Sequence, residues 1–188
     1  MLDKEQPNPD SPALRVIRVI DSVTGKFVYV VALLLAPLIL ANVVEVFMRY
    51  VLDSPTTWAA DVTVMTYGSL FMLGSAYAVL KGAHVRTDIF WNRFSERTKG
   101  IIDSVSYSLL FLPVMGLIFA ISIDDVFYAY SINERSILGL WQPAMWPFRA
   151  AIPLSASLLF AQGISELLKA LWQVRTGKEL VHHEKVEI

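Results

Sequence analysis

The chain has 188 residues, of which 55% are hydrophobic, and its mean hydropathy is +0.50. This composition is too apolar for an ordinary soluble domain of this size. The net charge of −1 gives no indication of a nucleic-acid partner, and the absence of cysteine excludes disulfides, thiolate metal sites and cysteine catalysis.

The N-terminal segment, residues 1–26, contains an amphipathic stretch. Its polar stripe consists of Arg15, Arg18, Ser22 and Lys26, and its apolar stripe of Val16, Ile20, Val23 and Phe27. Ser11 is a candidate N-cap, with Pro12 at the first helical position. The pattern predicts a basic helix lying in the interface at the cytoplasmic membrane surface. The alternative is a simple extension of the first membrane span.

Four apolar blocks predict four transmembrane helices, because about 20 apolar residues are needed to cross the hydrocarbon as a helix. The expected spans are about 27–48, 58–80, 101–123 and 147–170. The chain is therefore expected to be an all-α integral membrane protein with a membrane domain over residues 27–172 and a polar tail over residues 173–188. The first block is longer than a signal-peptide core and lacks a clear cleavage site, so we expect it to remain a span.

The basic residues predict that both termini are cytoplasmic. Along the five segments outside the spans, lysine and arginine together number four, one, five, two and four. This alternation follows the positive-inside rule. Trp58, Trp141 and Trp146 fall at the expected outer boundary, and Trp91 and Trp172 at the inner one, as interfacial anchors do.

The connection between the first two spans is rich in charge. Glu45 and Arg49 are four residues apart on one helix face and can pair. Asp61 returns into the membrane soon afterwards, and we expect it to meet Arg49 across the hairpin as a polar clasp. The alternative is three separately solvated charges at headgroup level.

The second span carries a stripe of small residues, Gly68, Ser75, Ala78 and Gly82. Small residues let membrane helices approach closely, so this stripe predicts a tight helix–helix interface within the chain or with a partner. A substrate path along it is disfavoured, because no ionisable residue lies at the centre of any span.

Proline interrupts three of the spans, at Pro37, Pro113 and Pro153. Membrane helices tolerate proline as a kink. No matching half-repeats accompany these prolines, so they predict kinks rather than the paired broken helices of a transporter site.

His84 is the only histidine outside the C-terminal tail and lies in KGAHVRTDIF, residues 81–90. A proton relay needs depth and partners, whereas this stretch lies at the cytoplasmic edge. A single histidine also cannot supply the two ligands that a membrane cytochrome uses for haem. We therefore expect a tight turn that begins at Gly82, with no cofactor and no metal.

Two stretches identify a family resemblance: MRYVLDSPTTWAAD at 48–61 and GSAYAVLKGAHVRTDIF at 74–90. They resemble the small membrane subunit, DctQ-like, of tripartite ATP-independent periplasmic (TRAP) transporters, and the likeness extends over roughly residues 27–172. The family often has two adjacent acids after the tryptophan. Here Ala60 and Asp61 stand there, so Asp61 must act alone if that acid pair contacts the partner.

The resemblance implies a non-catalytic subunit in the bacterial inner membrane that braces a large, sodium-coupled membrane subunit. A periplasmic solute-binding protein would deliver an organic acid or similar solute to that subunit. The implied partner-interface candidates are Arg49, Trp58, Asp61, Gly68, Ser75, Ala78, Gly82, His84, Arg86 and Asp88.

Two other hypotheses remain from the residues. A self-contained four-helix transporter working as a homodimer would need a membrane-embedded acid, and Glu45 is the candidate. A membrane enzyme or haem protein is disfavoured by the histidine count and by the lack of a Ser–His pair within the spans.

Overall fold

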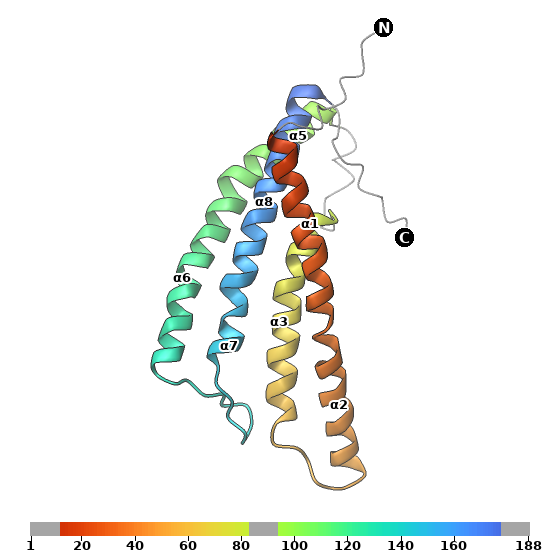
Figure 1. Cartoon of the computed structure of the whole chain (residues 1–188), viewed down its shortest axis with the longest axis vertical. Helices are drawn as coiled ribbons and strands as arrows, with labels where there is room; N and C mark the ends of the chain where they lie inside the picture. The colour runs from red at the N-terminus through yellow and green to blue at the C-terminus, as the bar shows by residue number, and fades with distance from the viewer. Residues whose placement is uncertain (1–11, 83–93, 178–188) are drawn as a thin grey trace.

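The protein is a bundle of long helices (Figure 1), described in a computed structural model over residues 12–82 and 94–177. Its elements are α1 (Pro12–Ala32), α2 (Leu35–Tyr50), α3 (Ala59–Leu80), α5 (Glu96–Ser106), the π-helical turn η1 (Tyr107–Phe111), α6 (Leu112–Ser131), α7 (Trp146–Arg149) and α8 (Ala151–Thr176). The predictions for Ser11 and for His84, Arg86 and Asp88 concern residues outside the described ranges.

Four of the described helical segments are long and apolar enough to cross a membrane, as predicted. They are Pro12–Tyr50, Ala59–Leu80, Glu96–Ser131 and Trp146–Thr176. The first has 39 residues, which is about 58 Å of helix against a hydrocarbon thickness of about 30 Å. The first, third and fourth segments extend beyond the expected spans at both ends, whereas Ala59–Leu80 matches the expected 58–80.

α1 begins at Pro12, and its inward residues Ile17, Thr24 and Val31 recur every seven positions. It packs along α3 and α8 and leads almost directly into α2. This packing fits the alternative in which the stretch extends the first span. A location in the membrane interface for its basic stripe remains a prediction.

The three prolines coincide with interruptions of regular α-helix, which is consistent with the predicted kinks. A proline has no N–H and collides with the carbonyl four residues earlier. For Pro37 that carbonyl is on Leu33, within the turn that separates α1 from α2. For Pro113 it lies within η1, and for Pro153 it belongs to the last residue of α7.

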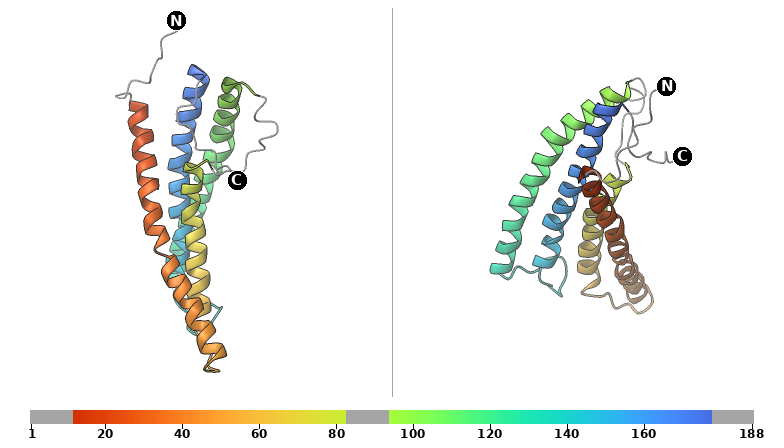
Figure 2. Two further views of the ribbon diagram at one scale, coloured as in Figure 1. Left: turned by 90° about the vertical axis from the view of Figure 1, so that its right-hand side faces the viewer. Right: turned by 45° about the horizontal axis from the view of Figure 1, so that its top comes forward.

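α8 is the central helix. It lies between α6 and α3 in Figure 1 and between α1 and α5 in the left view of Figure 2. It carries 11 buried residues, more than any other described helix. Gly100 lets α5 approach so closely that a Cβ there would lie 2.9 Å from the backbone nitrogen of Val174.

The bundle has two distinct ends. α1 begins and α8 finishes at one of them, the terminal end, where Ser95 caps α5 by accepting a hydrogen bond from the backbone N–H of Thr98. At the other, the loop end, residues 51–58 join α2 to α3, and residues 132–145, the tip loop, join α6 to α7.

Candidate functional site

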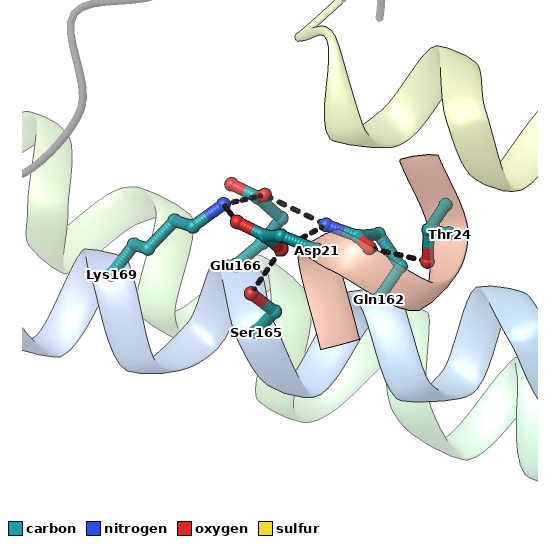
Figure 3. Close-up of polar contacts among 6 residues, drawn as sticks. All are labelled: Asp21, Thr24, Gln162, Ser165, Glu166 and Lys169. Carbon is teal, nitrogen blue, oxygen red and sulfur yellow. Dashed lines mark hydrogen bonds and ion pairs between the residues drawn. The ribbon is translucent and has the colours of Figure 1, made fainter. Parts of the chain in front are cut away.

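A buried polar network joins α1 to α8 toward the terminal end (Figure 3). Its six members are Asp21 and Thr24 from α1 and Gln162, Ser165, Glu166 and Lys169 from α8. Gln162 and Ser165 are fully buried, and Glu166 and Lys169 are less than a tenth exposed. Burying polar groups at this density is costly unless each finds a partner.

Lys169 provides the positive charge of this network. Its Nζ lies 2.8 Å from Asp21 Oδ2 and 2.7 Å from Glu166 Oε1. Two carboxylates therefore share one ammonium, and the cluster carries a formal charge of −1. Such an arrangement holds helices in one register, because removing the lysine would leave two carboxylates facing each other.

Gln162 connects the two helices through both ends of its amide. Its Nε2 donates to Asp21 Oδ1 at 3.0 Å and to Glu166 Oε1 at 3.2 Å, and its Oε1 accepts from Thr24 Oγ1 at 3.0 Å. Ser165 Oγ also donates to Asp21 Oδ1, at 2.7 Å. Both oxygens of Asp21 are thereby engaged, so the network is tightly satisfied.

A second charged cluster lies toward the loop end. Arg149 of α7 pairs with Asp125 of α6 through Nη1 and with Glu134 of the tip loop through Nη2, the latter at 2.6 Å. The guanidinium fork thus ties three consecutive parts of the chain together.

The predicted polar clasp on the first hairpin forms, but its residues are not all those that were expected. Glu45 and Arg49 pair as expected, with Arg49 Nε 2.9 Å from Glu45 Oε1. The other oxygen of Glu45 accepts from the backbone N–H of Thr56 at 2.9 Å and from its hydroxyl.

Asp61 does not contact Arg49, contrary to the prediction. Its carboxylate is fully buried and accepts a hydrogen bond from Ser136 of the tip loop, because α3 turns that face toward the loop.

Comparison with known proteins identifies the family. The family described as "Tripartite ATP-independent periplasmic transporters, DctQ component" matches residues 38–172. The chain belongs to the DctQ family. No curated protein and no solved structure matches it. The match begins after α1, so Asp21 and Thr24 lie outside it, whereas the α8 half of the network lies within it. The chain is thus a multi-pass small membrane component of a TRAP transporter.

The small-residue stripe predicted on α3 does not face a single direction. Gly68 lies against the ring of Phe148, where a Cβ would approach Phe148 Cε2 to 2.8 Å. Ser75 is half-buried and bonds the Met72 carbonyl of its own helix at 2.5 Å. Ala78, in contrast, is exposed. Gly68 therefore serves packing within the chain, and Ala78 is available to a neighbour.

The other described partner-interface candidates likewise include both exposed and enclosed side chains. Arg49 is exposed and Trp58 half-buried at the start of α3, whereas Asp61 is enclosed. Gly82 follows α3 with a φ of 66°, which glycine adopts without strain, so it ends the helix as predicted. A partner contact through any of these residues remains a prediction.

Several of the polar contacts were not anticipated from the sequence. The polar face of α8 had a usable signal, because Gln162, Glu166 and Lys169 recur at four- and three-residue steps within an otherwise apolar helix. Asp21 had none, since its partners are more than 140 positions away. Among the described residues, no group of three or more His, Cys, Asp and Glu is placed to hold a metal ion.

Proposed function

We propose that this DctQ-family chain is a non-catalytic brace for a large, sodium-coupled membrane subunit. That subunit would take up an organic acid or similar solute handed over by a periplasmic solute-binding protein. The brace would reside in the bacterial inner membrane with both termini in the cytoplasm.

The observation that carries this proposal is how the basic side chains of Lys169 and Arg149 are used. Lys169 is neutralised by Asp21 and Glu166, and Arg149 by Asp125 and Glu134. These groups join helices to one another, whereas a transport site needs charges that are free to bind and release a solute. Such pairing supports a rigid support rather than a moving carrier.

One surface cavity, beside the second charged cluster, does not have the location expected of a solute path. Its volume is about 480 Å³, and it is lined by Ile118, Ile121, Ser122, Asp124, Asp125 and Tyr128. All of these residues belong to α6, so the cavity is a depression on the surface of one helix. A solute path would instead be expected between helices.

The outward face of α3 is the surface that we assign to the large subunit. Its exposed positions are Ala60, Val64, Tyr67, Phe71 and Ala78, at steps of three, four and seven residues. A Cβ added at Gly74, on the same face, would meet nothing within 4 Å. Small residues beside two aromatic rings give a neighbouring helix room to approach.

The test is co-purification from native membranes in mild detergent, with mass spectrometry of the bound proteins. We expect a near-stoichiometric, many-spanning membrane protein. The double variant Gly74→Leu/Ala78→Leu should reduce its yield about tenfold, equivalent to about 1.4 kcal/mol of binding free energy. Both positions have space within this chain, so a loss would report on the partner.

Ala120→Leu is the matched control, because Ala120 is exposed on α6. Unchanged assembly in the double variant would reject the α3 surface. A purified homodimer that moves solute into liposomes on its own would reject the brace and favour the self-contained transporter.

A further inference from the structure

The tip loop exposes large apolar side chains to an unusual degree. Ile137 is 94% exposed and Leu140 is 85% exposed, and Leu138 and Trp141 are each more than half exposed. From Ser136 to Phe148 the chain has no charged residue, although Arg135 and Arg149 flank this stretch on both sides. A loop that faced water would be expected to be polar.

The conformation of this loop is nevertheless held by hydrogen bonds. Its two sides are joined by an isolated bridge between Arg135 and Ala144, and the backbone N–H of Ser136 donates to the Pro143 carbonyl at 2.9 Å. The hydroxyl of Ser136 accepts from the backbone N–H of Leu138 at 3.2 Å. These backbone groups bond within the loop, while the side chains of Ile137, Leu138, Leu140 and Trp141 are exposed.

A buried carboxylate fastens the loop to α3. Ser136 Oγ donates to Asp61, which is fully buried. Gly139 packs against the same carboxylate, since a Cβ there would lie 2.5 Å from Asp61 Oδ2 and 2.6 Å from the Thr57 carbonyl oxygen. Only glycine allows this approach. The loop is therefore held against the first turn of a membrane-spanning helix.

Two contacts give the depth of the loop relative to α3. Gly139 lies against Thr57 and Asp61, and Phe148 lies against Gly68. The loop and α7 therefore run beside roughly the first three turns of α3, or about 16 Å at 1.5 Å per residue. The 22 residues of α3 cover about 33 Å, close to the hydrocarbon thickness. With α3 spanning the bilayer, segments beside its first turns are therefore expected at the level of the bilayer rather than in bulk water.

Aromatic side chains at the loop end support the placement of the tip loop at the level of the bilayer. The rings of Tyr130 and Trp146 meet edge to face with centroids 5.9 Å apart, and Tyr128 and Tyr130 are both more than half exposed. With Trp141 they form a group of amphipathic rings at one end of the bundle. Tryptophan and tyrosine gather in this way at the boundary between acyl chains and headgroups.

From these observations we infer that the tip loop is a lipid-inserted wedge, whose Ile137, Leu138, Leu140 and Trp141 side chains bind phospholipid in the leaflet at the loop end. The occupants are the upper acyl chains and the glycerol region of the lipid. Asp61 and Ser136 are positioning residues that hold the wedge in place. The inference depends on the chain spanning a membrane and does not depend on the bracing function.

The absence of cysteine allows a direct test of depth. Nitroxide labels would be placed at Ile137→Cys and Leu140→Cys, one at a time, in the full-length chain in phosphatidylethanolamine–phosphatidylglycerol vesicles. Collision with dissolved oxygen, which concentrates in lipid, would be compared by electron paramagnetic resonance with collision with a water-soluble nickel chelate. Both positions are exposed, so the labels should not disturb folding.

Two reference positions calibrate the measurement. Leu117→Cys reports an exposed mid-helix position on α6, and Ser54→Cys reports the exposed connection between α2 and α3. We expect the oxygen-to-nickel ratio at Ile137 and Leu140 to shift from the Ser54 value toward the Leu117 value. A ratio at the Ser54 value would place the loop in water, and low collision with both reagents would mean that protein covers it. Either result overturns the inference.

Discussion

Lys169 is the residue on which the α1–α8 network depends most. It sits within 3 Å of Asp21 and Glu166 and is almost completely buried. We predict that Lys169→Met lowers the free energy of unfolding by about 3 kcal/mol, because it leaves the half-buried carboxylate of Asp21 and the buried carboxylate of Glu166 without a counter-charge. Thermal unfolding of the purified chain in detergent measures the change.

Arg175→Met is the matched control, since Arg175 is exposed on the same helix and its replacement should have little effect. The triple variant Asp21→Asn/Glu166→Gln/Lys169→Met tests the cause. It should recover much of the loss, because no unpaired charge then remains. A triple variant as unstable as Lys169→Met would show that the lysine contributes through packing.

Helix packing at the scale of elements depends on α5 and α8 approaching closely. A Cβ at Gly100 would lie 2.9 Å from the Val174 backbone nitrogen and 3.0 Å from the Ala170 carbonyl oxygen. Backbone atoms cannot move aside as a side-chain end can. We therefore predict that Gly100→Ala destabilises the chain by about 1–3 kcal/mol in the same unfolding measurement.

Gly74→Ala provides the comparison for that prediction. A Cβ at Gly74 meets nothing within 4 Å, and alanine replaces glycine in a helix with a gain of about 0.5–1 kcal/mol. The two variants make the same chemical change and should move the unfolding midpoint in opposite directions. Equal shifts would contradict the close α5–α8 contact.

The elements that sequence predicted correctly are those set by local pattern. The four spans follow from runs of apolar residues, and the Glu45–Arg49 pair from a spacing of one helical turn. Asp61 shows what such patterns leave out. Its partner Ser136 is 75 positions away, and the rotation of α3 and the path of the tip loop decide that contact. Both are features of the tertiary structure, which the periodicity of the sequence does not encode.

Across the whole molecule, lysine and arginine are distributed unequally between the segments that flank the spans. The predicted orientation places the terminal end in the cytoplasm, because lysine and arginine concentrate in the segments on that side. The structure supplies the geometry for testing this, since Ser54 lies in the connection at the loop end and Arg175 in the last turn of α8. Both side chains are exposed.

Single cysteines at these two positions give the measurement, against a chain with no cysteine of its own. In spheroplasts, a membrane-impermeant maleimide should label Ser54→Cys at once and Arg175→Cys only after the membrane is disrupted. The opposite pattern would invert the molecule and place the tip loop in the cytoplasmic leaflet. The two arms also separate orientation from folding, because labelling of both positions after disruption shows that each is accessible. An orientation with the loop end outside is the one in which Arg49, Trp58 and the α2–α3 connection could meet a periplasmic partner.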